Sequence, residues 1–515
     1  MEKEAAYPIG TVVNATPDEI TIAVPETAPE WEAIYKDTGI DVRWLSPPTY
    51  EPPAGIPPRR GDLLKTVSDG RVSFVMVKDV QYSRPSDWTA SPEWLTEPDR
   101  PHVVAKAEVL GEFYNGRLRK PEDITRLVSK VYWLSRSDVE KIVKKDGSDI
   151  YFGYITCRFV DGGVLRSEGI PLSLSSSDLF GSSILLIGDR MTGKTYAIAK
   201  LVDAIYMLHK EEKDYDVSVV IFDIRGEYEG LREEGEFQFI TSEAARVISL
   251  GEAAREVALG FGIDYMSPDD ILKAVAPSLP SSWVRALKEA LSDVEDEIKK
   301  ELDKRITLER IEEALKRRFK PDEWEDVQRI IKIIEEAFPE TRRCKLLDPM
   351  SVTVIDFTRE ILAPRQRDNM LNDVLYELWR ELLRRWRRGA LKKHRTVLVF
   401  EACEELAPKR GMELTDVSEL VRDRIFDLLS AAPYINCLIL MSSSRPSRIY
   451  ESLLMAVPNF VLSFMGDPVE AGVIEKLLGV PQGELKSLGR REYLVRGRIS
   501  PLIAPIKVSL GEVRT

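Results

Sequence analysis

Short apolar runs, separated by charged stretches, divide the chain, and several of them look like strands buried on both faces. The uninterrupted runs are residues 184–187, 217–222, 397–400 and 438–441. Runs of this length are typical of central parallel strands that helices cover on both sides. Strands that alternate with helical periodicity predict an α/β fold, a doubly wound sheet that binds ligands at the carboxyl ends of its strands.

The first 165 residues show a different pattern, because their apolar stretches are short, rich in β-branched residues and separated by turn signals. We expect strands at residues 9–13, 20–24, 71–80 and 102–110, and a helix at 135–145. The proline-rich stretch at 45–58 lacks backbone donors and is expected to be a loop. The pattern predicts a small N-terminal β-barrel over residues 1–165.

Residues 251–345 are amphipathic and strongly charged, and they predict a solvated helical insertion that splits the α/β core into 166–250 and 346–515. A long helix is expected from about residue 367, and a basic cluster follows at its end: Arg384, Arg385, Arg387, Arg388, Lys392, Lys393 and Arg395. Such a cluster is suited to nucleic-acid phosphates. An exposed helix end, whose cations suit the helix dipole, is the alternative, and both remain open.

The chemistry-bearing stretch lies between the run at 184–187 and a helical pattern, and it reads Gly188-Asp189-Arg190-Met191-Thr192-Gly193-Lys194-Thr195. This G-x-x-x-x-G-K-T spacing is that of a phosphate-binding loop, so the core is predicted to be a P-loop (RecA-like) NTPase. Gly188 and Gly193 allow backbone N–H groups to turn toward phosphates. A chance match is the alternative, which the flanking strand and helix argue against.

The residues that follow Gly193 are predicted to bind ATP and Mg²⁺. Lys194 is expected to reach the β- and γ-phosphates, and the Thr195 hydroxyl is expected to hold Mg²⁺. We include Tyr196, the next residue, among the nucleotide-binding residues.

Acidic and cationic candidates follow two later apolar runs. Glu401 comes directly after the run at 397–400 and is the candidate second Mg²⁺ ligand and catalytic acid. Glu404 is a further catalytic candidate if the turn carries it back to the site. Arg445, after the serines at 442–444, is placed to stabilise phosphate charge within a subunit or across an interface. The alternatives are an exposed strand-end Glu and a Ser-rich turn closed by Pro446.

Taken in order, these segments resemble the HerA family of archaeal and bacterial hexameric ATPases, relatives of the FtsK DNA pumps. The resemblance covers nearly the whole chain and is carried by residues 9–13 and 60–62, the phosphate loop, and the segments 223–228, 399–408 and 443–446. It implies a homo-oligomeric, hexameric ring that uses ATP to thread double-stranded DNA. It also implies a NurA-like nuclease as the partner in DNA-repair processing of broken ends.

Several positions depart from the family pattern. Met191 stands where the family loop has its middle glycine, Ala402 stands at one acid position, and Ser444 replaces a glutamine. (A register shifted by one would make Glu401 the catalytic acid and leave Phe400 in the first acid's place.) Residues 432–434 lack the family's candidate arginine finger, and in P-loop enzymes such a loss costs about 10³–10⁵ in rate. A degenerate paralogue that binds ATP as an oligomeric scaffold is therefore the second hypothesis. A metabolic kinase is a distant third.

Composition adds limits to this picture. The formal net charge of −12 over 515 residues excludes a protein coated in nucleic acid but not local DNA contacts. No run of 18 apolar residues is present, the N-terminus has no signal-peptide pattern, and four scattered cysteines indicate neither zinc nor disulfides, so we expect a cytoplasmic protein without membrane contact. Abundant Glu, Lys and Arg is typical of hyperthermophiles.

Overall fold

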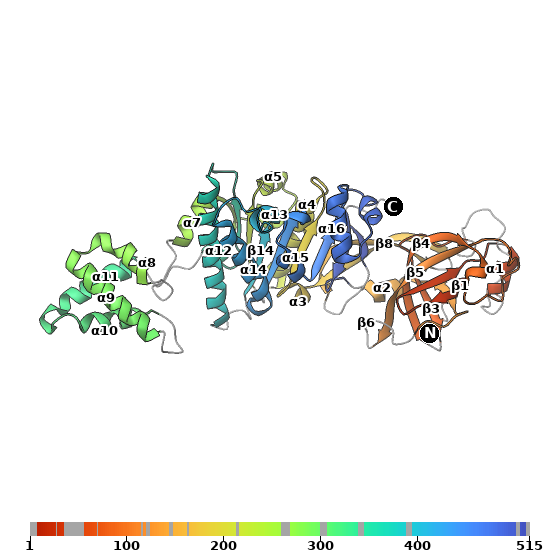
Figure 1. The fold of residues 1–515 in the computed structure, drawn as a ribbon, viewed down its shortest axis with the longest axis horizontal. Coiled ribbons are helices and arrows are strands. Elements are labelled where there is room, and N and C mark those ends of the chain that lie inside the picture. The colour runs from red at the N-terminus through yellow and green to blue at the C-terminus, as the bar shows by residue number, and fades with distance from the viewer. Residues whose placement is uncertain are drawn as a thin grey trace. The chain divides into compact units, whose positions relative to one another are not determined.

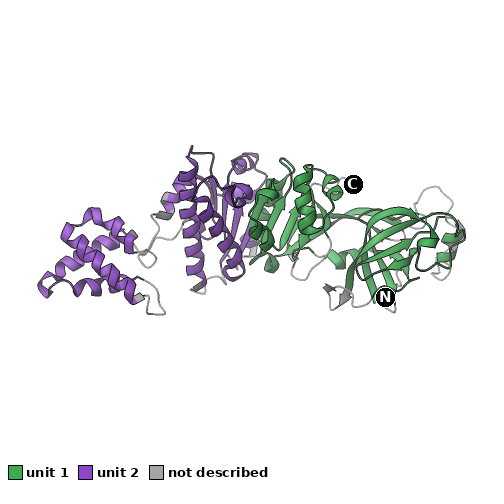
Figure 2. Ribbon diagram, viewed as in Figure 1, with its two compact units in different colours: residues 1–208, 440–515 green, residues 209–439 purple. Residues whose placement is uncertain are grey.

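The computed structural model of the chain, shown in Figure 1, describes residues 8–26, 28–35, 56–68, 71–114, 117–119, 124–143, 148–161, 164–212, 216–258, 268–298, 306–337, 345–387, 394–500 and 505–510. The chain forms two compact units, which Figure 2 distinguishes by colour. Unit 1 comprises residues 1–208 and 440–515, and unit 2 comprises residues 209–439.

Unit 1 contains the N-terminal barrel that the sequence predicts. Antiparallel pairing gives the strand order β2-β1-β7-β3-β4-β5, and β2 also pairs with β5, which closes the barrel. The strands are β1 (Pro8–Ala15), β2 (Glu19–Ala23), β3 (Leu63–Ser68), β4 (Arg71–Ser83), β5 (His102–Tyr114) and β7 (Lys130–Trp133). Alternate residues of these strands, among them Val12, Ile22 and Val75, are buried in one apolar core. The short strand β6 (Arg117–Arg119) pairs antiparallel with the end of β5. This part of the chain also contains the helices α1 (Ala28–Tyr35) and α2 (Arg136–Val143).

An arginine on the next strand ties the barrel to the rest of unit 1. Arg158, on β8 (Ser148–Asp161), donates from Nε to Oδ1 of Asp62 at 2.9 Å, and its guanidinium lies 5.0 Å from the ring centroid of Trp133. Strand β8 pairs with β9 (Val164–Ser175), so the predicted domain boundary at residue 165 lies within a strand pair.

The remaining strands of unit 1 form an α/β layer with the order β15-β10-β16-β17-β18-β8-β9. Strand β10 (Ser183–Ile187) pairs in parallel with β16 (Asn459–Leu462), and β17 (Glu492–Gly497) and β18 (Ile506–Ser509) add antiparallel pairs. Strand β15 (Cys437–Ser443) crosses the boundary between the units. The helices that accompany this layer are α3 (Ser176–Leu179), α4 (Lys194–Glu212, whose last residues belong to unit 2), α15 (Glu451–Ala456), α16 (Pro468–Leu478) and α17 (Gln482–Lys486).

Unit 2 contains a fully parallel set of strands in the order β12-β13-β11-β14. Their bounds are β11 (Asp216–Asp223), β12 (Ala245–Ser249), β13 (Val352–Asp356) and β14 (His394–Phe400). The helices are α5 (Glu227–Glu234), α6 (Gln238–Thr241), α7 (Leu250–Ala258), α12 (Pro364–Arg387), α13 (Cys403–Leu406) and α14 (Ser418–Ile435). Parallel strands alternating with helices, together with the barrel in unit 1, confirm the predicted fold class.

Four helices within residues 251–345 bury a core of their own. They are α8 (Pro268–Val275), α9 (Ser281–Ile298), α10 (Leu308–Lys316) and α11 (Trp324–Ala337), and the buried residues include Leu287, Ile311 and Ile330. Apolar residues recur at helical spacing, so each helix turns one face inward and its charged face outward. None of the described helices combines the length and the apolar character needed to cross a membrane.

Two sequence predictions fall partly outside the described residues. Of the proline-rich loop at 45–58, the structure describes only residues 56–58. Within the basic cluster, Arg388, Lys392 and Lys393 lie outside the described residues, whereas Arg384 and Arg385 both pair with Glu381. For Arg384 and Arg385, the cations are therefore engaged within their own helix, α12.

Candidate nucleotide-binding site

The predicted phosphate loop connects β10 to α4 in unit 1, as its sequence requires. Lys194 begins α4, and its side chain folds back over the loop. Its ammonium donates to the carbonyl oxygens of Gly188 at 3.0 Å and Asp189 at 2.7 Å. Lys194 is only 8% exposed, so carbonyl oxygens replace the water that this charge loses on burial. The loop thus holds a cation where a phosphate-binding loop needs one.

Neighbouring strand ends fix the shape of the loop. Gly188 donates its N–H to the carbonyl of Ser443 at 3.2 Å, and Asp189 donates to that of Phe464 at 2.9 Å. The hydroxyl of Thr192 lies 2.7 Å from that of Ser463. A Cβ on Gly188 would lie 1.7 Å from the Ser463 hydroxyl oxygen, so this glycine is required by close packing.

Met191, which stands in place of the middle glycine, lies in the backbone region that glycine favours. Met191 has φ of 63°, in the left-handed region that glycine adopts most readily, and Gly193 has φ of 99°. The Met191 side chain is 95% exposed and meets no steric obstacle in the loop. The conformation costs a non-glycine residue about 1–2 kcal/mol, a cost that the strand-end contacts of the loop must offset.

The acidic candidates belong to unit 2, at the carboxyl end of β14. Glu401 is 6% exposed, and its Oε1 accepts a hydrogen bond of 3.0 Å from the hydroxyl of Tyr228. Burial and the negative charge of Glu401 raise the pKa of Tyr228 well above its ordinary value. Tyr228 is therefore a permanent donor at neutral pH, and its hydroxyl fixes the position of Oε1 of the Glu401 carboxylate.

Asp223, at the end of β11, explains why Tyr228 reaches Glu401. The Asp223 carboxylate accepts hydrogen bonds from the backbone N–H groups of residues 225–228, at 2.9–3.2 Å, and so caps the first turn of α5. Burial raises the pKa of Asp223, against the lowering effect of these N–H groups. Gly226 makes the turn with φ of 70°. The segment 223–228 therefore holds the Tyr228 side chain in its position.

Glu404 and its neighbours form the second acidic position. Glu404 lies on α13, is 9% exposed, and its Oε1 lies 3.8 Å from Nη2 of Arg225. Ala402 begins this short helix with φ of 51° and is 3% exposed. The turn thus keeps Glu404 inside the protein, and Ala402 places a buried methyl group at the position where the sequence resemblance, in its first register, expects an acid.

Arg445 follows β15 in unit 1 and is exposed. Its backbone N–H donates to the hydroxyl of Ser443 at 3.1 Å, which shapes the turn before Pro446. Thr195 and Tyr196 lie in the first turn of α4 and are half-buried. The structure therefore groups the loop residues with Arg445 in unit 1 and Glu401 with Glu404 in unit 2. The roles assigned to these residues stay predictions.

Tyr228→Phe is expected to lower the apparent affinity for Mg²⁺ in ATP turnover by about 10- to 100-fold. This is the usual effect of removing a group that orients a metal ligand. Phenylalanine keeps the buried ring and removes only the donor to Glu401. ATP hydrolysis measured over a series of Mg²⁺ concentrations checks this. Tyr434→Phe, at a site 70% exposed, is the matched control, and equal Mg²⁺ curves for both variants would contradict the role of Tyr228.

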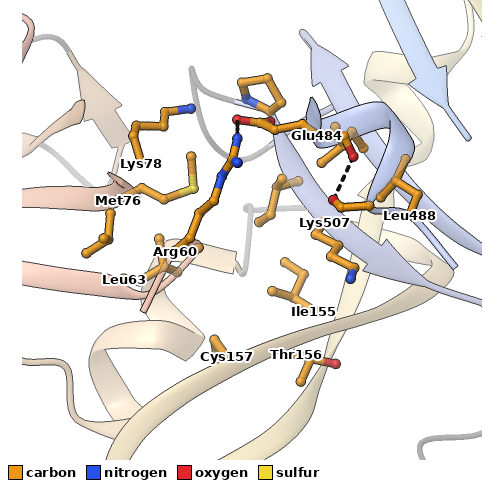
Figure 3. Close-up of a pocket in the computed structure, with 16 residues that line it drawn as sticks. Arg60, Leu63, Met76, Lys78, Ile155, Thr156, Cys157, Glu484, Leu488 and Lys507 are labelled. Atoms are coloured by element: carbon orange, nitrogen blue, oxygen red, sulfur yellow. Dashed lines mark hydrogen bonds and ion pairs between the residues drawn. The ribbon is translucent and has the colours of Figure 1, made fainter. Parts of the chain in front are cut away.

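A cavity of about 190 Å³ lies elsewhere in unit 1, between the barrel and strands β8, β17 and β18 (Figure 3). Arg60 of the barrel pairs with Glu484 across it at 2.6 Å. Lys78 and Lys507 also line the cavity, and each is paired with a glutamate. Burial raises the pKa of the Cys157 thiol to about 12, so it is not a nucleophile at neutral pH. No residue of the phosphate loop lines this cavity.

Sequence reasoning missed the groups that hold the candidate residues in place. Tyr228 was visible only as part of the family-like segment 223–228, and its partner Glu401 lies 173 positions further along the chain. Ser463 directly follows strand β16, and a polar residue after an apolar run was the available signal. Tyr493, whose hydroxyl donates to the carbonyl of Gly193 at 2.8 Å, gave no signal.

Comparison with known proteins gives a family match. Residues 160–374 match the family described as the central domain of helicase HerA. The match covers the phosphate loop and the segment 223–228, which are two of the features that carry the sequence resemblance, and it also covers the helical insertion. An uncharacterised protein of Aquifex aeolicus is 23% identical over 164 residues, which are 32% of this chain and 55% of that protein. The chain thus spans about half the length of this relative.

Among solved structures, the chain is similar to VirB4 of Thermoanaerobacter pseudethanolicus, at 14% identity and a TM-score of 0.37, with 72% of this chain and 98% of that one covered. Another is the genome packaging NTPase B204 of Sulfolobus turreted icosahedral virus 2 in complex with ATP-gammaS, at 13% identity and a TM-score of 0.31, with 64% and 98% covered. Scores this low support no argument about this chain, and the family match covers residues 160–374 only.

Proposed function

This chain is HerA-like over residues 160–374, and from that premise we propose that it is an ATP-driven translocase of double-stranded DNA that works as a homo-oligomeric ring. The observation that carries the proposal is the assembled phosphate loop, in which Lys194 is buried against the carbonyls of Gly188 and Asp189. A buried ammonium at the start of a helix suits the β- and γ-phosphates of ATP.

Mg²⁺ fits the donors that the chain offers. The described residues contain no group of three or more His, Cys, Asp or Glu side chains that could hold a metal ion by themselves. Mg²⁺ needs fewer protein ligands, because substrate phosphates and water complete its coordination. Thr195 and Glu401 are the proposed protein ligands, and Tyr228 orients the second of them. The metal would supply charge neutralisation on the phosphates.

The finer part of the proposal concerns the process and the partner. The sequence resemblance to HerA implies action at broken DNA ends together with a NurA-like nuclease. The net charge of −12 means that DNA contact must come from local basic patches rather than from the whole surface. A ring that encloses the duplex needs only such local contacts, because the ring itself prevents dissociation.

The experiment that tests this function is ATP hydrolysis with and without linear duplex DNA, on protein whose oligomeric state is measured in the same sample. We expect turnover that duplex DNA stimulates, in an oligomer larger than a dimer. Lys194→Ala supplies the background. Turnover no higher than that of this variant, at the working temperature of the protein, would refute the translocase proposal.

A second candidate function is an ATP-bound scaffold with little hydrolysis. The buried Ala402, 3% exposed at an acid position of the family, favours it, as do Ser444 and the segment 432–434. Its expected result is tight ATP binding and ATP-dependent oligomerisation without turnover. Ala402→Glu alone is a weak discriminator, because a glutamate at this buried position must displace its neighbours before it can act.

A further inference from the structure

An aromatic and cationic cluster lies beside the first turn of α4, in unit 1. The guanidinium carbon of Arg491 lies 4.0 Å from the ring centroid of Tyr196, and Nζ of Lys200 lies 5.9 Å from the same centroid. Both Tyr196 and Arg491 are half-buried. An arginine stacked on a tyrosine presents an extended planar surface.

This cluster is joined directly to the phosphate loop. The Tyr493 hydroxyl donates to the carbonyl of Gly193 at 2.8 Å. A Cβ on Gly193 would lie 2.6 Å from that hydroxyl oxygen and 3.8 Å from Cγ of Arg491. The side chains of Arg491 and Tyr493 therefore lie against the loop residue that immediately precedes Lys194.

Two further tyrosines continue the aromatic surface on β8. The rings of Tyr151 and Tyr154 meet edge to face at 5.4 Å between centroids. Burial, the hydrogen bond with Tyr154 and the nearby Tyr196 hydroxyl all raise the pKa of Tyr151. Strand β18 pairs with both β8 and β17, and this pairing brings these residues into the same part of the sheet.

The backbone at Arg491 is held in an unusual conformation. Its φ is 64°, which is rare for a residue other than glycine, asparagine or aspartate. The Leu510 N–H donates to the Arg491 carbonyl at 3.0 Å and so fixes this turn at the start of β17. Strained residues of this kind cluster at functional sites, where the surrounding structure imposes the geometry.

We propose that Arg491 and Tyr196 form the platform on which the purine base of the bound nucleotide stacks, and that Tyr493 fixes this platform to the phosphate loop. The inference rests on the proposed function, since it presupposes that the loop binds ATP. The Arg491–Tyr196 pair lies beside the first turn of α4 and next to Gly193, so it borders the loop that is proposed to hold the phosphates. A guanidinium and an aromatic ring both stack on a nucleobase through their flat faces.

The test compares the binding of ATP with that of inorganic tripolyphosphate, which has no base, by calorimetry on the full chain. Arg491→Lys keeps the charge and removes the planar guanidinium. We expect it to weaken ATP binding about tenfold, from the loss of one stacking interaction. Tripolyphosphate binding should stay unchanged. Arg490→Ala, at the exposed neighbouring arginine, is the matched control and should change neither.

Tyr493→Phe gives a distinct expected result, because it removes only the hydroxyl that holds Gly193. Loss of one hydrogen bond is expected to weaken ATP and tripolyphosphate binding alike, by about fivefold. If the wild type binds ATP and Arg491→Lys binds it as tightly as Arg490→Ala does, the base platform is refuted and the proposed function stands. If the wild type binds neither ligand, the proposed function fails, and this inference fails with it.

Discussion

Lys194→Ala is expected to lower ATP turnover by at least about 10²-fold, because it removes a preorganised charge from the position where phosphate charge develops in the reaction. The Lys194 ammonium is held by the carbonyl oxygens of Gly188 and Asp189, at 3.0 Å and 2.7 Å. Bound phosphate oxygens are stronger acceptors than these neutral carbonyls, so the lysine gains by turning to the nucleotide. Steady-state hydrolysis at saturating ATP, together with ATP binding by calorimetry, measures the loss.

The control for this substitution is Lys210→Ala, which makes the same charge change near the other end of α4 at an exposed position. It should leave turnover and ATP binding as they are in the wild type. The variant Lys194→Ala should also keep the folded stability of the protein, because the substitution removes the buried positive charge itself. Wild-type turnover in Lys194→Ala would mean that the loop at 188–195 is not the catalytic phosphate site.

The architecture was predictable from sequence because the barrel, the parallel strands and the helices each have a different spacing of apolar residues. The run at 217–222 became the buried parallel strand β11 (Asp216–Asp223), and the stretch at 9–13 became the barrel strand β1 (Pro8–Ala15). Boundaries moved by up to four residues: β5 ends at Tyr114 rather than at residue 110, and α12 begins at Pro364 rather than near residue 367. Helix ends are set by local caps and by proline, which suits the first turn of a helix.

The contacts that organise the candidate site were not predictable in the same way. Glu401 could be proposed from its place after a strand, but its hydrogen bond to Tyr228 depends on the turn that Asp223 caps. Tyr493 reaches Gly193 only because β17 pairs with β16, which in turn pairs with β10. Such contacts follow from strand order, and strand order between distant segments leaves no periodic signal in the sequence.

The departures from the family pattern have different structural consequences. Met191 adopts a left-handed backbone conformation, which costs a residue with a side chain a small amount of stability and removes no reactive group. Ala402 removes a carboxylate and leaves a buried methyl group in its place. The first departure therefore changes stability by a small amount, whereas the second removes a chemical group. Whether hydrolysis is fast then depends on the acids that remain, Glu401 and Glu404.

Glu401→Gln is the second substitution with a large expected effect, a fall in turnover of about 10²–10³-fold, because a neutral amide neither binds Mg²⁺ strongly nor accepts a proton. Glutamine still accepts the hydrogen bond from Tyr228, so the fold around the site is preserved. ATP binding should change far less than turnover, and single-turnover hydrolysis separates the two.

Glu404→Gln decides which acid carries the reaction in the absence of an acid at position 402. Its neighbour Glu405 lies within 4.0 Å of the same Arg225 and is much more exposed, so Glu405→Gln is the matched control. If Glu404 only pairs with Arg225, both variants keep wild-type turnover while Glu401→Gln loses it. A loss in Glu404→Gln as large as that in Glu401→Gln would instead make Glu404 the residue that replaces the missing acid. Wild-type turnover in Glu401→Gln would refute the role proposed for Glu401, because this variant lacks the carboxylate that is proposed to bind Mg²⁺ and keeps the hydrogen bond from Tyr228.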